Sequence, residues 1–256
     1  YAGWSAYNYV LGNPVRLVDP KGMAAAPPHD YFDKNGTYLG NDKRVDEYYK
    51  GEGIRIVTKE GASSDEWFSN SVRFNEERLS EDAVVKIAKY YQTKYLNEPT
   101  IKVIAKTNIR IGLQTGNSDG SELFVRGNEV FAKDPAVIVG MSGYNRVQHM
   151  QNDKWFFINS LHHENIHVNS FSYDPSIKMY RAPNDMDGYG DDANFLHGLV
   201  YLQQVHHPSY SKMGSLTRIF ANGYIKTDLL GAFSSTKTGQ SYKRSLEYMF
   251  NKILKD

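Results

Sequence analysis

The hydrophobic pattern near the start of the chain is that of β-structure. Residues 53–58 alternate between apolar and polar positions, which predicts a strand with one buried face. In residues 31–39, Asn35-Gly36 lies between aromatic and β-branched positions, the strongest short signal for a hairpin. We therefore expect a hairpin and a further strand in this region.

The period changes to that of a helix between residues 83 and 91. Apolar side chains recur at positions 83, 84, 87, 88 and 91, which lie on one face of a helix. Ser80 precedes this stretch and two acidic residues follow it, as expected for an N-cap and a first turn. We expect this helix to end before Asn97 and to face the core.

A run of short apolar segments separated by turn signals follows. Each is three to five residues long and rich in strand-forming residues, and glycine, asparagine or proline lies between them. We expect one twisted antiparallel or mixed sheet built from residues 101–105, 109–113, 123–126, 130–132 and 136–139.

The second half of the chain has helical patterns. A helix that begins near Asn152 carries apolar residues on more than one face as far as Val168, so we expect it to be buried. Residues 193–204 predict another helix, with Asp191 or Asp192 as its N-cap, and residues 241–253 predict a closing helix. Strands followed by helices indicate an α+β fold.

Composition and charge exclude several classes of function. The 256 residues carry a net charge of +1 and show no cluster of Lys and Arg, so we expect no nucleic-acid partner. The chain has no cysteine, which excludes disulfides, thiolate metal sites and cysteine nucleophiles. No apolar run approaches the roughly 18–20 residues that span a bilayer, so we expect no membrane-spanning segment.

Candidate chemistry centres on His163-Glu164-x-x-His167, within the predicted buried helix. Positions i and i+4 share a helix face, so both imidazoles could bind one metal ion, and Glu164 could take a proton from a metal-bound water. This H-E-x-x-H spacing is typical of zinc-dependent hydrolases. The alternative is a pair of hydrogen-bonded core histidines with Glu164 in a salt bridge.

Catalytic zinc takes three protein ligands and leaves one position to water, so a further ligand must come from elsewhere in the chain. We favour His197, which lies within the predicted helix 193–204. Its separation from His167 leaves room for a loop and for this second helix to pack against the first. The sequence also leaves open Asp187, Asp191, Asp192, His206 and His207.

The sequence also offers candidates for the other roles in the reaction. We expect Glu164 to act as general base and to pass the proton to the leaving amine. Tyr201 or His206 could stabilise an oxyanion, and Asn169 or Asp192 could orient a ligand histidine.

The first 22 residues contain the ordered motifs Trp4-Ser5-x-Tyr7-Asn8-Tyr9, Asn13-Pro14-Val15 and Asp19-Pro20-x-Gly22. With these motifs the segment resembles the closing part of the core of bacterial RHS-repeat proteins. In that family a variable cargo, often a toxin, follows the D-P-x-G of a large secreted or surface-delivered protein. The resemblance implies that residues 1–22 are the tail of the core, residues 23–30 a linker and residues 31–256 the cargo domain, with any export signal upstream. It also implies a role for Asp19 in releasing the cargo, although Asp19 could equally be a local hydrogen-bond acceptor in a turn.

The cargo region resembles the zincin-type metallopeptidase domains found at the ends of RHS proteins. Their second helix reads E-x-x-A-Y-x-x-Q-x-x-H-P-[ST]-aromatic, and its first Glu is the third ligand. The matching run here is His197-x-x-Val200-Tyr201-x-x-Gln204-x-x-His207-Pro208-Ser209-Tyr210, with His in place of Glu. The resemblance implies a zincin-like fold, in which a second ligand-bearing helix follows the sheet and the buried H-E-x-x-H helix. The loop 185–190 is similar to that of zincins with an aspartate ligand, but Met186 stands at the position of their Asp.

These observations lead to one main hypothesis and two alternatives. We expect a Zn²⁺-dependent metallopeptidase that acts as a secreted toxin on a peptide or protein substrate, and an immunity protein could be its partner. The alternatives are a non-enzymatic binding or adhesion module that keeps the zincin fold, and a metal-dependent nuclease. Zinc content and the effect of Glu164→Gln on cleavage separate the three.

Overall fold

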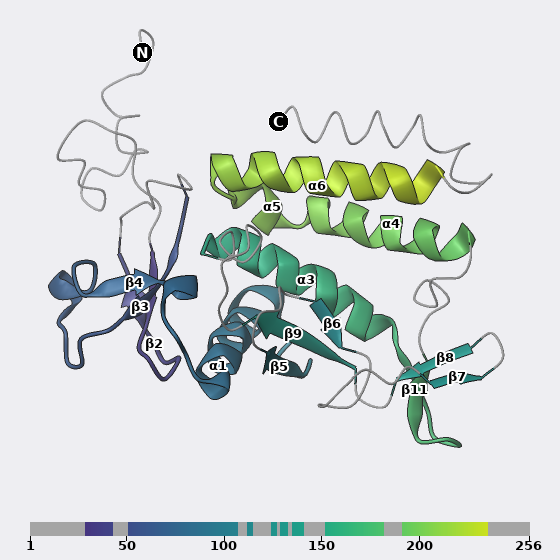
Figure 1. The fold of residues 1–256 in the computed structure, drawn as a ribbon, viewed down its shortest axis with the longest axis horizontal. Coiled ribbons are helices and arrows are strands. Elements are labelled where there is room, and N and C mark those ends of the chain that lie inside the picture. Colours follow the sequence, from purple (N-terminus) through teal and green to yellow (C-terminus); the bar gives the residue numbers. More distant parts are fainter. Residues whose placement is uncertain are drawn as a thin grey trace, which may run out of the picture.

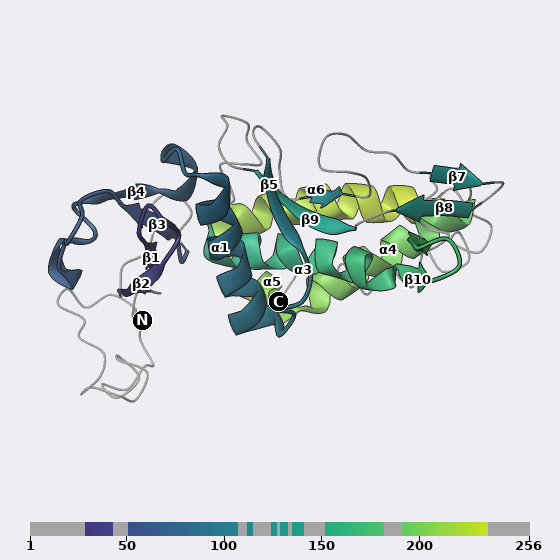
Figure 2. The same ribbon diagram turned by 90° about the horizontal axis from the view of Figure 1, so that it is seen from below.

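The computed structural model describes residues 29–42, 51–106, 112–114, 124–126, 129–132, 135–140, 152–181 and 191–234. The fold is of mixed α+β type, as predicted. Three small sheets and the helices α1, α3, α4, α5 and α6 are arranged along one long axis (Figures 1 and 2). One sheet lies at one end of this axis, and α3 runs from near it toward a second sheet at the other end.

The first sheet has the order β2-β1-β3-β4, formed by β1 (Asp30–Phe32), β2 (Tyr38–Asn41), β3 (Ile54–Val57) and β4 (Ser71–Arg73). β1 and β2 form the predicted antiparallel hairpin, and β3 pairs with β1 in parallel. Gly36 in the hairpin turn has φ +77°, and a Cβ atom there would lie 2.3 Å from the backbone oxygen of Ala83. Both the turn and its close contact with the next helix therefore require glycine.

Helix α1 (Glu81–Tyr91) follows two short 3₁₀ turns at Ser64–Glu66 and Phe74–Glu76. Ser80 is its N-cap, as predicted, and its hydroxyl accepts a hydrogen bond from the Ala83 amide. The five apolar positions recognised in the sequence are the buried ones. A π-helical turn, Gln92–Leu96, continues α1 and ends at Asn97, which adopts the left-handed conformation with φ 55°.

The five short strands predicted for one sheet are all present but divide between two. β5 (Val103–Lys106), β6 (Gly112–Gln114) and β9 (Ala136–Gly140) form a mixed sheet of order β5-β9-β6. β7 (Phe124–Arg126) and β8 (Glu129–Ala132) instead join β10 (Ser172–Asp174) and β11 (Met179–Arg181), two strands that were not predicted from the sequence. The division arises because β8 pairs with β11, which follows α3 in the chain.

Helix α3 (Lys154–Ser170) is the buried helix of the sequence prediction. It packs against β6, β9 and the π-helical turn on one side and against α4 and α5 on the other (Figure 1). Burial on both sides explains why its apolar residues occupy more than one face. The side chains of Phe157, Ile158 and Leu161 are fully buried.

Three helices complete the described chain: α4 (Asp191–His206), α5 (Pro208–Lys212) and α6 (Ser215–Ser234). The sequence predicted α4 but neither α5 nor α6. Helix α6 packs along α4, on the side away from the strands in Figure 1. None of the helices in the described ranges is both long and apolar enough to cross a membrane.

Some predictions concern residues outside the described ranges. These are the RHS-like segment 1–22, positions 23–28 of the proposed linker, the loop residue Asp187 and the closing helix 241–253. The last two positions of the proposed linker are described, and both are buried: His29 accepts a hydrogen bond from the Gly53 amide, and Asp30 begins β1. Asp30 is therefore part of the first sheet, and His29 contacts the residue that precedes β3.

Candidate metal centre

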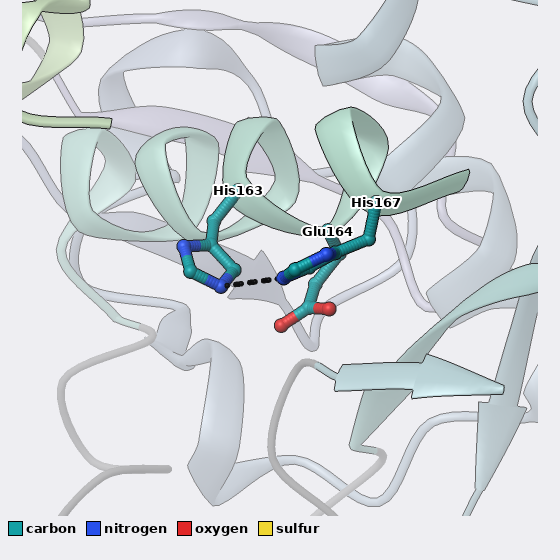
Figure 3. A group of neighbouring side chains, drawn as sticks. All are labelled: His163, Glu164 and His167. Carbon is teal, nitrogen blue, oxygen red and sulfur yellow. Dashed lines mark hydrogen bonds between the residues drawn. The ribbon is translucent and has the colours of Figure 1, made fainter. Parts of the chain in front are cut away.

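His163 and His167 lie one turn apart on α3, and their Nε2 atoms are 3.2 Å apart (Figure 3). Both side chains are buried, with exposed fractions of 8% and 5%. The carboxylate of Glu164 points to the same side of the helix, and one donor atom from each of the three residues lies within 4.8 Å of the others. Within the described part of the chain, this is the only such group of potential metal ligands.

The separation of the two nitrogens fits a shared zinc ion. Imidazole nitrogens bound at about 2.0–2.1 Å to a tetrahedral zinc lie about 3.3–3.4 Å apart. The observed distance of 3.2 Å is close to this value. Two imidazoles and a neighbouring carboxylate are also a donor set that suits zinc better than Ca²⁺ or Mg²⁺, which prefer oxygen ligands.

Helix α4 supplies the groups that surround His163. Nδ1 of His163 lies 3.0 Å from Oε1 of Gln204, and the ring of Tyr201 lies 4.8 Å from the His163 ring between centroids. Gln204 and Tyr201 are both buried. Tyr201 was a sequence candidate for stabilising an oxyanion, and Gln204, on the same face of the predicted helix as His197, was expected to line the site without a specific role.

The predicted third ligand, His197, lies on α4, but only its backbone is described. The same holds for Asp191 and Asp192, at the start of α4, and Asp187 is outside the described residues. The structure therefore places the helix that carries His197 against α3 and leaves its ligand role as a prediction.

His206 and His207, also considered as ligands from the sequence, do not join the His163–Glu164–His167 group. His206 is exposed, and its Nδ1 lies 2.7 Å from the backbone oxygen of Leu202. His207 is the N-cap of α5, where its Nδ1 accepts a hydrogen bond from the Ser209 amide. Asn169, a candidate for orienting a ligand, instead donates to Glu98.

His207 also stacks on His162, the neighbour of His163 in the chain. Their ring centroids are 4.2 Å apart and their planes differ by 29°. Burial, and in second place the proximity of His207, lowers the pKa of His162 to about 4. Burial and Lys212 likewise lower the pKa of His207. His162 is therefore a neutral packing residue at pH 7.

The position of α3 is fixed by polar contacts at its N-terminus and on its far side. Asp153 caps the helix: its Oδ1 accepts from the amides of Trp155 and Phe156, and its Oδ2 accepts from the Gly214 amide. On the face opposite the histidines, Gln92 donates to Asn165 at 2.9 Å, and both side chains are fully buried. These contacts join the N-terminus of α3 to Gly214 and its far side to the π-helical turn.

Comparison with known proteins gave no match to a protein-family model, to a curated protein or to a solved structure.

Proposed function

We propose that this protein is a zinc-dependent metallopeptidase. One observation carries the proposal: two buried imidazoles on one helix direct Nε2 atoms toward each other at 3.2 Å, with the Glu164 carboxylate beside them. Burying two imidazoles with their ring nitrogens this close is costly unless they share a proton or a metal ion.

In this proposal His163 and His167 hold the zinc, and His197 on α4 completes the set. Bound zinc would polarise the carbonyl group of the substrate and lower the pKa of a bound water. The Glu164 carboxylate would act as the general base, taking a proton from the attacking water and passing it to the leaving amine. Its side chain is partly exposed while the two imidazoles are buried, so it is the member of the group that substrate and solvent can reach.

We further propose a zincin-like fold and delivery as an RHS cargo, a secreted toxin that an immunity protein would restrain. The buried helix that carries His163 and His167, packed between a mixed sheet and a second helix, supports the fold proposal. The motifs of residues 1–22 support the delivery proposal.

The decisive experiment combines metal analysis with a peptide-cleavage assay. We expect the purified protein to bind about one equivalent of zinc, and Glu164→Gln to retain the zinc while losing at least about 100-fold in cleavage rate. We expect His167→Ala to lose the metal. Glu98→Gln is the matched control, because Glu98 is also partly exposed but contacts Asn169 instead of the site.

Two results would overturn the proposal. A protein that takes up no zinc after dialysis against it would exclude the metal centre. Zinc binding with unchanged toxicity in Glu164→Gln would favour the non-enzymatic binding module instead.

A further inference from the structure

We infer that Gln204 and Asn159 are positioning residues that fix His163 in the tautomer protonated at Nδ1, so that the lone pair of Nε2 faces the metal position. This inference deepens the proposed function and rests on it for the identity of the metal. The tautomer itself is a property of the metal-free protein.

The tautomer of His163 can be inferred step by step from the backbone oxygen of Gln204, which can only accept hydrogen bonds. Nδ2 of Asn159 lies 2.9 Å from the backbone oxygen of Gln204. A backbone carbonyl can only accept a hydrogen bond, so the nitrogen of this amide must face it. The orientation of the Asn159 amide is therefore set by the backbone of α4.

The orientation of Asn159 then sets that of the Gln204 side chain. Oδ1 of Asn159 lies 2.9 Å from Nε2 of Gln204 and accepts its hydrogen bond. The oxygen of the Gln204 amide must then point the other way, toward Nδ1 of His163 at 3.0 Å. A carbonyl oxygen cannot donate, so Nδ1 of His163 carries the proton. In a neutral imidazole, Nε2 is then the acceptor or ligand atom.

The chain of hydrogen bonds continues from Asn159 to Ser209 and His207, with the same direction from donor to acceptor. Asn159 also donates to Oγ of Ser209 at 2.9 Å. The Ser209 hydroxyl lies 2.7 Å from Nδ1 of His207, which already accepts from the Ser209 amide and is therefore the acceptor here too. Each group from His163 to His207 thus donates to the next, and such a chain polarises every bond in it.

Burial favours these orientations of the Asn159 and Gln204 amides over the flipped ones. Asn159, Gln204 and Ser209 have exposed fractions of 0%, 6% and 1%. A flipped Asn159 amide would leave two buried donors facing each other, which is unfavourable. A fixed partner on the second nitrogen of a ligand histidine sets its tautomer and ring orientation, and its loss typically lowers metal affinity about 10–100-fold.

The first test measures the tautomer in protein freed of metal with EDTA. Long-range ¹H–¹⁵N NMR correlations report which imidazole nitrogen carries the proton, and the His163→Gln variant assigns the signal. We expect the Nδ1–H form in the native protein and a mixture in the near-isosteric variants Gln204→Met and Asn159→Leu. Gln204→Glu keeps an acceptor at the same place and should restore the Nδ1–H form.

Two matched controls separate this role from simple packing. Gln203→Met makes the same change on the exposed side of α4, and Asn165→Leu removes another fully buried asparagine of α3 whose partner is Gln92. Neither variant should change the His163 tautomer. An Nε2–H form in the native protein, or an unchanged tautomer in Gln204→Met, would overturn the inference.

The second test measures zinc affinity by competition with a chelator. We expect Gln204→Met to bind zinc about 10–100-fold more weakly and Gln204→Glu to recover most of that loss. Native affinity in Gln204→Met would overturn the inference. If the native protein bound no zinc while the tautomer still depended on Gln204, the hydrogen-bond chain would stand and the proposed function would fail.

Discussion

His162 and His163 are neighbours in the chain, yet they face different surroundings on α3. His163 faces His167 and Gln204, whereas His162 stacks on His207. Burial, and in second place His207, lowers the pKa of His162 in the folded protein to about 4, below its ordinary value of 6.5. The folded state therefore binds this proton less readily than the unfolded chain.

We predict that acid destabilises the fold through His162. The pKa of His162 is lower in the folded protein than in the unfolded chain. The contribution of His162 to the free energy of unfolding is therefore fully present above pH 6.5 and is lost as the pH falls toward 4. His162→Phe keeps a stacked ring that cannot be protonated, so its free energy of unfolding should fall less over this range. Urea unfolding at pH 7, 5.5 and 4 measures the difference. His206→Phe, at an exposed position, is the control, and parallel curves for native protein and His162→Phe would contradict the prediction.

The sequence predicts the residues of the candidate site that lie on one helix, but not the contact that a second helix makes with them. His163, Glu164 and His167 are close because they lie within five positions of one helix, and that geometry follows from the helical repeat alone. Gln204 meets His163 across 41 positions, through the packing of α4 on α3. No local pattern contains that contact, although the helix of Gln204 was itself predictable.

At the scale of elements, the predictions succeeded where local signals agreed and failed where they conflicted or were absent. The hairpin turn and the N-cap of α1 were predictable because the residues that form them, Gly36 and Ser80, are of the types that such turns and caps require. Helix α6 instead contains Asn222-Gly223, a pair that is typical of turns, in the middle of its length. β10 and β11 have three residues each, and they pair with each other and with β8. Packing and long-range pairing override the local signal in these elements.

The N-cap of α3 gives a prediction at this scale. Burial raises the pKa of Asp153 to about 6, against an ordinary value of 3.8, although the amides that it accepts from oppose the shift. Because the pKa of Asp153 is higher in the folded protein than in the unfolded chain, its contribution to the free energy of unfolding is fully present below about pH 4. This contribution is lost as the pH rises through 6. The difference of about two pH units corresponds to about 3 kcal/mol.

We therefore expect the stability of the native protein relative to Asp153→Asn to fall by up to about 3 kcal/mol between pH 4 and 7. Asn at this position keeps a capping oxygen for α3 but cannot ionise. Chemical unfolding of both proteins across this range, compared pH by pH, isolates the contribution of the one carboxyl group. A difference that does not change with pH would show that Asp153 titrates normally.

At the scale of the whole molecule, a buried ionic cluster joins the first sheet to α3. Nζ of Lys154 lies 3.2 Å from Asp30 in β1 and 2.7 Å from Glu52, and Asp30 also accepts a hydrogen bond from the Tyr91 hydroxyl. The side chains of Lys154 and Asp30 are 4% and 0% exposed. Burial alone would lower the pKa of Lys154, but Asp30 and Glu52 together raise it above its ordinary value. Elements 124 positions apart in the chain are thus held together by charge as well as by apolar contacts.

Such a cluster predicts a specific pattern of mutational effects. Lys154→Met leaves the carboxylate of Asp30 buried without its main counter-charge, which typically costs about 3–5 kcal/mol in the free energy of unfolding. The double variant Asp30→Asn, Lys154→Met removes both charges and should recover part of that loss, because apolar or neutral replacements of buried pairs are often tolerated.

Lys59→Met is the control. Lys59 also pairs with a carboxylate, that of Glu66 at 2.6 Å, but on the surface, where an ion pair contributes about 0–1 kcal/mol. Equal losses in Lys154→Met and Lys59→Met would show that the cluster is hydrated and does not hold the sheet to α3. A large loss with partial recovery in the double variant would show that the charge of Lys154 serves mainly to neutralise Asp30 at this junction.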